Sequence, residues 1–529
     1  MRLTLNALPL DANGAQLLRS MLVGDRSNAA ADAVIAHAME LGAKFAVVEQ
    51  PYTDLDYSAD YQTFYAGAFK DYPRHTKRVH LFAEDVSDIL EGPFAGQGEA
   101  LEARGYLGFV VVRPISQGPI GRTVLRFPEP DDGLIVRRAA RARTRVHLAG
   151  AELHVEGAPF IQQEAKVGAC AQAAIWMASL PVHIRHRTPR FTMADITRLA
   201  VTPTDAILSR VLPAGSDGLN PAHMIRALRG MGHQPLFDVF KGQGLSLPLG
   251  YAASMVLRYL DSGLPVILAM DDVGHAVTAV GYVEAPGAAI APGQTYDCFA
   301  RALLVNDDQR GPYRLLPLRA ADADQLPRGR LMMNGADVLT VDGAVSHMFV
   351  PLPPRVFLPA HRADIVARDF LQRQAIELGA HFAELSEQSS QAAGQGVRSF
   401  FDAVLADRLV RRTYLTSAAR YRHHLSQSDV ADSVKVELLD RALPHYVWVT
   451  ELMDRSSTHL TADGARAILG HLVVNATSSS DPDNDLLLSH TPHVVVHRDM
   501  NGAGSARGEV EESAVLVDDD HPYAGRIRR

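Results

Sequence analysis

Cysteine is scarce in this chain, since Cys170 and Cys298 are the only two in 529 residues. A secreted scaffold stapled by disulfides needs several cysteines, so that class is excluded. Long hydrophobic runs are lacking as well. No stretch reaches the roughly 18 consecutive apolar residues of a membrane span, and the first residues lack the basic segment and apolar run of a signal peptide. We therefore expect a cytoplasmic protein that has no membrane partner.

A strong excess of charge of one sign is also missing. Lys and Arg number 52 against 60 for Asp and Glu, which leaves a formal net charge of -8. Binding to nucleic acid depends on clustered Lys and Arg, so no nucleic-acid partner is expected. Apolar residues make up 47% of the chain, which is typical of a globular protein with a large core.

The chain is long enough for about three domains at the usual size. Clusters rich in proline and in turn-forming residues, PEPDDG at 128–133 and PLPPR at 351–355, mark two boundaries. They predict four regions: an N-terminal α/β domain of unknown role at 1–135, a central domain at 136–354, an α+β domain at 355–500, and a disordered tail at 501–529. Whether the first and third regions form one domain around the central block is left open.

Hydrophobic periodicity predicts the main elements. We expect helices over 14–42 and 361–425, a hairpin of strands at 106–115 and 121–127, and further strands at 45–49, 79–82, 446–452, 471–476 and 494–497. In the central region, Asn220 and Pro221 are expected to begin a helix as its N-cap and first residue.

Cys170 precedes an apolar segment, AQAAIWMASL, which predicts a helix that ends at Pro181. The positive end of a helix lowers the pKa of a thiol placed there, and the thiolate is the nucleophile in cysteine chemistry. Gln162 and Gln163 lie shortly upstream. A side-chain amide on this approach could help the backbone N–H of Cys170 to stabilise an oxyanion. Taken alone, Cys170 is better explained as a small buried residue at a helix start, and the residues that follow in the chain change that balance.

A histidine and an acidic turn follow in the same region. His275 comes directly after a glycine, at the first position of the alternating segment HAVTAVGYV, where an imidazole can face a cleft as a general base. The next strand, ALLV, ends in Asn306, Asp307 and Asp308. A side chain there could accept the imidazole N–H and orient the ring, although an Asx turn that closes the strand fits the same residues.

The order of these elements, glutamine, cysteine on a helix, histidine on a strand and an Asx residue at the end of the next strand, resembles the papain-like cysteine peptidases. The resemblance is to the bacterial double-glycine-leader peptidase-like (C39-like) family and covers about 200 residues. It implies an α+β fold with a papain-like core, in which a helix carries the cysteine and an antiparallel sheet carries the histidine and aspartate. The flanking regions would be mixed α/β domains.

By this resemblance Cys170 is the nucleophile, His275 the general acid and base, Asp307 the residue that orients the histidine, and Gln163 the oxyanion donor. The alternatives to Asp307 for orienting the histidine are Asn306 and, after it, Asp308. The alternative to Gln163 as the oxyanion donor is Gln162. The implied activity is a thiol-dependent hydrolase, most simply a peptidase acting on a peptide or protein, that needs no cofactor and no metal. The oligomeric state is left open.

The sequence departs from the family pattern at three points. The interval from His275 to Asp307 is longer than in the family, because PGAAIAPGQ at 286–294 inserts a loop between the two strands. Ala171 follows the cysteine where the family has glycine, and Glu164 occupies the usual place of the oxyanion glutamine. A transglutaminase-like acyltransferase would use the same residues. A non-enzymatic interaction or sensor protein that keeps a papain-like core is the alternative from another class.

Several other polar clusters can be considered as metal-binding sites. HIRHR at 183–187 and YRHHL at 421–425 are rich in histidine but have no partner cluster with metal-ligand spacing, so they are interpreted as solvated helix faces. DPDND at 481–485 lacks the glycine and terminal glutamate of a calcium loop. His490, His493 and His497 alternate around a strand and are a weak candidate for metal binding.

Overall fold

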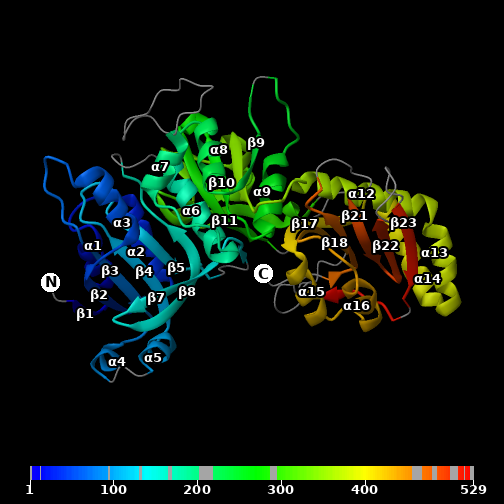
Figure 1. Ribbon diagram of the computed structural model, residues 1–529, viewed down its shortest axis with the longest axis horizontal. Helices are drawn as coiled ribbons and strands as arrows, with labels where there is room; N and C mark the ends of the chain where they lie inside the picture. The colour runs from blue at the N-terminus through cyan, green and yellow to red at the C-terminus, as the bar shows by residue number, and fades with distance from the viewer. Residues whose placement is uncertain are drawn as a thin grey trace.

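The computed structural model describes residues 3–524 apart from 12, 93–95, 130–133, 165–169, 202–218, 243, 286–294, 455–466, 479–484, 501–509 and 518. Within these residues, three large antiparallel sheets follow one another along the long axis of the molecule, with helices packed against them (Figure 1). The first and third sheets lie at opposite ends, on either side of the central one. The N-terminal and C-terminal regions are therefore separate units and do not form one domain around the central block.

The first sheet has the strand order β1-β2-β3-β4-β5-β8-β7. Its strands are β1 (Thr4–Pro9), β2 (Phe45–Tyr52), β3 (Thr76–Phe82), β4 (Tyr106–Val112), β5 (Ile120–Arg126), β7 (Ala142–Leu148) and β8 (Ala151–Phe160). The predicted hairpin is present as β4 and β5, which pair in antiparallel fashion. Every residue of β4 is buried, as its unbroken apolar sequence requires of a strand that is covered on both faces.

Short helices cover the first sheet. They are α1 (Gly14–Leu22), α2 (Ala29–Glu40), α3 (Leu55–Asp60), α4 (Ser87–Glu91) and α5 (Gln97–Ala103). The segment expected to be helical over 14–42 thus contains two helices, and the side chain of Asn28 caps the second by accepting a hydrogen bond from the backbone N–H of Ala31.

The central sheet has the order β13-β12-β11-β10-β16-β9, and β6 pairs with β11 beside this path. Its strands are β6 (Ile135–Arg138), β9 (Gln234–Val239), β10 (Val266–Met270), β11 (His275–Glu284), β12 (Ala300–Asp307), β13 (Gly311–Pro317) and β16 (His347–Leu352). The helices of this part are α6 (Cys170–His186), α7 (Met193–Val201), α8 (Pro221–Gly230), α9 (Tyr251–Asp261), α10 (Ala320–Ala323) and α11 (Val341–Ala344), and β14 (Met333–Asn334) pairs with β15 (Asp337–Val338). Asn220 and Pro221 begin α8 as predicted.

The chain divides between the first two sheets differently from the predicted ranges. The sequence predicts a boundary between residues 135 and 136, but β7 and β8, which follow it, belong to the first sheet. Only β6, at 135–138, reaches across to pair with β11 of the central sheet. The chain therefore crosses between the two sheets more than once, and the cluster at 128–133 lies near the first crossing.

The helix that begins at Cys170 is longer than predicted. Pro181 lies inside α6, which continues to His186. A proline inside a helix removes one backbone hydrogen bond and usually bends or ends the helix. Here the second half is held by packing, because Pro181 and Val182 are both buried, and by Arg185, whose Nη1 donates to the carbonyl oxygen of Gly263 over 2.8 Å.

The third sheet has the order β17-β18-β20-β21-β22-β23. Its strands are β17 (Leu409–Ser417), β18 (Tyr446–Asp454), β20 (Gly470–Asn475), β21 (Leu486–Thr491), β22 (Val494–Met500) and β23 (Val510–Leu516), and β19 (Ala467–Ile468) pairs with β24 (Tyr523–Ala524). The accompanying helices are α12 (Ala360–Glu377), α13 (Gly379–Ser389), α14 (Gln391–Leu405), α15 (Ala418–Gln427) and α16 (Asp432–Leu439).

Two expectations for this part are wrong. The segment 361–425 is not helical throughout, because β17 interrupts it and pairs along its whole length with β18. The segment predicted as a disordered tail contains β23, which pairs with β22 from Val494 to Met500, while its residues 501–509, 518 and 525–529 lie outside the described residues. In both cases pairing with a neighbouring strand decides the structure, and this tertiary contact is invisible to local periodicity.

Two hydrophobic clusters join the three sheets. One contains residues of the first sheet together with Trp176 of α6 and Ile267 and Phe349 of the central sheet, so α6 lies between the two sheets. The other continues from the central sheet into the third, where Arg412 of β17 also pairs with Asp261 at the end of α9 over 3.0 Å. Within the described residues, no helix is both long and apolar enough to span a membrane.

Candidate functional site: Cys170, His275 and Asp307

Cys170 and His275 each begin an element of the central part of the chain. α6 starts at Cys170, and β11 starts at His275 directly after Gly274, whose φ of +63° ends the short turn from β10 in the left-handed region. α6 packs against β11, and the hydroxyl of Thr278 donates to the carbonyl oxygen of Ala174 over 2.9 Å. This bond lies one helical turn from Cys170 and three residues from His275, so it holds the start of the helix close to the start of the strand.

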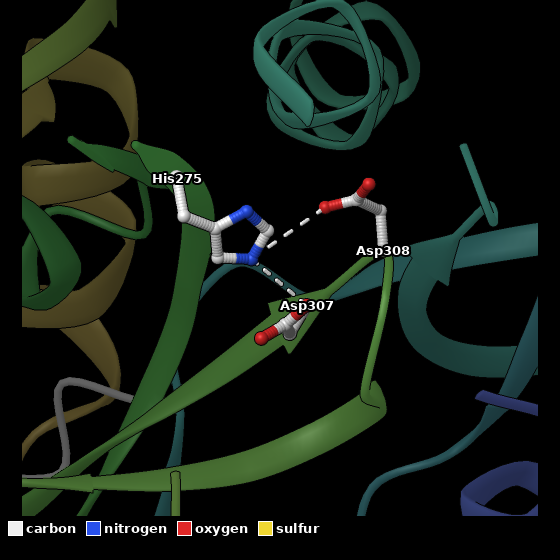
Figure 2. Close-up of side chains that lie close together, drawn as sticks. All are labelled: His275, Asp307 and Asp308. Carbon is white, nitrogen blue, oxygen red and sulfur yellow. Dashed lines mark hydrogen bonds and ion pairs between the residues drawn. The ribbon is translucent and has the colours of Figure 1, made fainter. Parts of the chain in front are cut away.

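The imidazole of His275 has partners on two sides. Its Nε2 lies 3.0 Å from Oδ1 of Asp307, at the end of the neighbouring strand β12. The side chain of Cys170 also acts on the imidazole, since it is among the causes that raise the pKa of His275. Figure 2 shows the carboxylates of Asp307 and Asp308 near the same nitrogen of the ring. The structure therefore brings together three of the predicted residues, with the histidine between the cysteine and the aspartate.

Asp307 is held rigidly by the turn that follows it. Its Oδ1 also accepts hydrogen bonds from the backbone N–H groups of Gln309 and Arg310, at 2.9 and 3.1 Å. Its Oδ2 accepts one from Nη1 of Arg310 at 2.9 Å. With the bond to His275, the carboxylate has four donors, and such an arrangement favours its ionised form. Asp307 can thus fix the ring of His275 in one orientation.

The charges of this site oppose the effect of burial. Burial lowers the pKa of His275, but the hydrogen bonds to Asp307 and Cys170 and the negative charges of Asp307 and Asp308 outweigh it and raise the pKa to about 10. Burial raises the pKa of Asp307, while the hydrogen bond and charge of His275, and the charge of Arg310, hold it below its ordinary value. The site therefore favours an imidazolium and a carboxylate at neutral pH.

Asp308 is the least satisfied residue of the site. Its side chain is fully buried, and neither carboxylate oxygen has a hydrogen-bond partner among the described residues. Its Oδ1 lies 3.9 Å from Nε2 of His275, which is beyond hydrogen-bonding distance. Burial and, to a smaller extent, the charge of Asp307 raise its pKa to about 7, although His275 acts in the opposite direction. Asp308 is therefore ionised in only part of the molecules near neutral pH.

His275, Asp307 and Asp308 are also the candidate metal ligands that the described residues contain. One ligand atom from each lies within 4.8 Å of the others. One imidazole nitrogen and two carboxylate oxygens suit a divalent ion such as Zn²⁺, and the unused oxygens of Asp308 fit that interpretation. Binding would require Nε2 of His275 to exchange its hydrogen bond with Asp307 for a bond to the metal.

Two of the alternative site residues have other partners. The side chain of Asn306 points away from His275, since its Nδ2 donates to the carbonyl oxygen of Pro159 and its Oδ1 accepts from the backbone N–H of Tyr313. Gln162 forms a reciprocal amide pair with Asn28, with distances of 3.1 and 3.2 Å. Both side chains join the first sheet to neighbouring elements, so neither is placed to act on a substrate at Cys170.

Gln163 is half-buried and immediately precedes Glu164, which is buried. Residues 165–169, which connect both to Cys170, lie outside the described residues, and the role of Gln163 as an oxyanion donor stays a prediction. Sequence reasoning missed Gln309, an exposed residue whose Nε2 lies 3.5 Å from Nδ1 of His275. Its position two residues after Asp307, in the same acidic turn, was the available signal.

The histidine candidates of the third sheet have protein partners. Nε2 of His490 lies 3.0 Å from Oδ2 of Asp520, and Nε2 of His497 lies 3.2 Å from Oε2 of Glu437. Nδ1 of His493 bonds the carbonyl oxygen of Val517. The three side chains therefore do not converge on one point. The predicted turn at 481–485 lies outside the described residues except for Asp485.

Comparison with known proteins adds no further constraint on the site. No protein-family model, no curated protein and no solved structure matches this chain. The functional argument therefore rests on the geometry of Cys170, His275 and Asp307, which suits nucleophilic attack by a thiolate followed by proton transfer from the imidazole.

Proposed function

We propose that this chain is a cysteine hydrolase with a papain-like core that cleaves an amide bond, most simply in a peptide or protein. One observation carries the proposal: the imidazole of His275, whose pKa the side chain of Cys170 helps to raise, is hydrogen-bonded to Asp307, which three further donors hold in place. A nucleophile, a base and a residue that orients the base are the three parts that covalent acyl transfer requires.

The reaction follows from these positions. The thiolate of Cys170 attacks the carbonyl carbon of the substrate, and a carbon–sulfur bond forms while the carbonyl oxygen becomes an oxyanion. The backbone N–H groups at the start of α6 can stabilise this charge. The imidazolium of His275 then gives its proton to the leaving amine, and the carbon–nitrogen bond breaks. Water, deprotonated by His275, attacks the resulting thioester and releases the acid and the thiol group.

The test compares the reactivity of the two cysteines of the chain. The rate of alkylation by iodoacetamide is measured at Cys170 and at Cys298 from about pH 6 to about pH 9 by peptide mass spectrometry, in the wild type and in His275→Ala. We expect Cys170 to react rapidly even at about pH 6, well below the ordinary thiol pKa of about 8.5, and to lose this reactivity in the variant. Cys298, which lies in the 3₁₀ turn Tyr296–Phe299, is the internal control and should be unaffected.

If Cys170 and Cys298 react slowly and alike in both proteins, the hydrolase proposal is wrong and a non-enzymatic role is favoured. If Cys170 is reactive, products formed with and without an added primary amine separate hydrolysis from acyl transfer. Cys170→Ala should then abolish turnover while its far-ultraviolet circular dichroism stays that of the wild type.

A further inference from the structure

A cavity of about 270 Å³ lies where the end of α6 meets the start of α15, between the central and third parts of the molecule. Its polar lining is basic or carries hydroxyl groups, and no Asp or Glu contributes to it. The basic residues come from two stretches, Arg185, His186 and Arg187 at the end of α6 and Arg420 with His445 on the other side. This is unexpected in a chain whose net charge is -8.

The cationic groups of the cavity act on one another. Burial and, to a smaller extent, the positive charges of Arg185 and Arg420 lower the pKa of His186 to about 4. The charges of Arg420 and Arg185 also contribute to the lowered pKa of His424. Like charges gathered at a concave surface repel each other, and an anion bound among them would relieve the repulsion.

Arg185 is positioned by a local arrangement of the backbone. Its Nη1 donates to the carbonyl oxygen of Gly263 over 2.8 Å. Gly263 has a φ of +71°, and a Cβ atom at this position would collide with the guanidinium group of Arg185. Glycine is therefore required both by the backbone conformation and by the close approach of the arginine. The guanidinium group is held at the cavity instead of extending into solvent.

The opposite wall contains the start of α15. Ser417 caps α15, which runs from Ala418 to Gln427, and its side chain accepts a hydrogen bond from the backbone N–H of Arg420. Thr416 and Ser417 place two hydroxyl groups in the lining. The start of a helix carries partial positive charge, so this wall favours an anion together with the guanidinium groups.

We propose that this cavity binds the phosphate group of a small phosphorylated molecule. Three guanidinium groups, two hydroxyl groups and a helix start supply the planar donors and positive charge that a phosphate dianion accepts. The ring of Tyr446, which also lines the cavity and lies edge-on to His445, offers an apolar surface for the rest of the ligand. This site goes beyond the proposed hydrolase, and its test needs no turnover.

The experiment is isothermal titration calorimetry of the full chain with inorganic phosphate and with a nucleoside 5′-monophosphate, at constant ionic strength set with sodium chloride. We expect saturable binding of one phosphate per chain. In the double variant Arg187→Gln and Arg420→Gln, affinity should fall by roughly tenfold for each guanidinium removed. Both arginines are exposed, so the variant is expected to fold.

Arg373→Gln, an exposed arginine on α12 outside the cavity, is the matched control and should bind phosphate as the wild type does. Tighter binding of the nucleotide than of inorganic phosphate would identify a phosphorylated metabolite as the ligand, while equal affinity would point to phosphate itself. The proposal is overturned if the wild type shows no saturable binding of either probe, or if the double variant binds them as tightly as the wild type.

Discussion

The hydroxyl of Thr278 donates a hydrogen bond to the carbonyl oxygen of Ala174, which ties the strand that begins with His275 to the helix that begins with Cys170. Both partners are fully buried, so water cannot replace the bond if it is lost. The distance between the thiol and the imidazole therefore depends on a contact that touches neither group.

Replacing Thr278 by Val removes this hydroxyl at nearly constant volume. We expect the free energy of unfolding to fall by about 1–3 kcal/mol, because the carbonyl oxygen of Ala174 loses a buried partner. The alkylation rate of Cys170 at about pH 6 should also fall. Thr413→Val is the control, since Thr413 is equally buried and bonded in the third sheet. It should lower stability without changing the reactivity of Cys170, and equal effects of both variants on reactivity would contradict the prediction.

Replacing Asp307 by Asn keeps the shape of the side chain but removes its charge. The hydrogen bond and charge of Asp307 are the main causes that raise the pKa of His275, so this pKa should fall toward the value that burial favours. Nuclear magnetic resonance of the imidazole protons would record the fall directly. Alkylation of Cys170 at about pH 6 should slow by at least tenfold, the change that corresponds to about 1.4 kcal/mol.

The matched control for that variant is Asp272→Asn. Asp272 is an exposed carboxylate three residues before His275, and its side chain is 78% exposed. The same loss of charge there is screened by water and should leave both measurements unchanged. If Asp272→Asn slowed alkylation as much as Asp307→Asn, the effect would be one of general charge and would not depend on the hydrogen bond.

The raised pKa of the buried Asp308 makes the stability of the folded chain depend on pH. Its pKa is about 7 in the folded chain against an ordinary value of 3.8, so the folded state binds the proton more tightly than the unfolded state. The cost of ionising it is absent below its ordinary pKa and reaches its full size above pH 7. The wild type should therefore lose stability as the pH rises through this range, and Asp308→Asn should remove that loss.

Urea unfolding at about pH 5 and about pH 8 measures this effect. We expect Asp308→Asn to gain roughly 1–3 kcal/mol over the wild type between the two conditions, the usual cost of a buried unsatisfied polar group. Asp337→Asn, at an exposed position in β15, serves as the control. An equal effect of Asp308→Asn at both pH values would contradict the prediction.

Chelation separates the thiol site from the metal-binding interpretation of the same residues. After dialysis against EDTA, the alkylation rate of Cys170 should be unchanged, because the proposed mechanism uses no metal. A rise or fall in that rate, reversed by adding Zn²⁺, would instead mean that His275, Asp307 and Asp308 hold an ion. Dialysis of Asp308→Asn in parallel tests the residue whose oxygens are unused.

The sequence identified the residues of the site but not the direction in which each side chain points. His275 at the start of a strand follows from Gly274 and the alternation after it, and Asp307 follows from the end of the next strand. Asn306, Asp307 and Asp308 are neighbours, and the choice among them depends on an irregularity in the pairing of β12 with β13 between Val305 and Asp307. Such a bulge changes which side chains point toward a given face, and nothing in local residue types reports it.

The same limit applies to the fold. The helix start at Asn220 and Pro221 and the hairpin of β4 and β5 follow from local chemistry, and both are present. The extension of α6 beyond Pro181 depends on burial, and the separation of β17 from the surrounding helices depends on its pairing with β18. These outcomes are decided by contacts between distant parts of the chain.

The chain crosses repeatedly between the first and central sheets around residue 135, and this limits how the two sheets can be separated. The chain passes from the first sheet to the central one at β6, returns for β7 and β8, and crosses again to reach α6. Three covalent connections between two bodies leave no single linker about which they could swing. A protease that cuts one connection would not release a fragment, and any truncated gene that ends near residue 135 would lack two strands of the first sheet and would not yield a folded product.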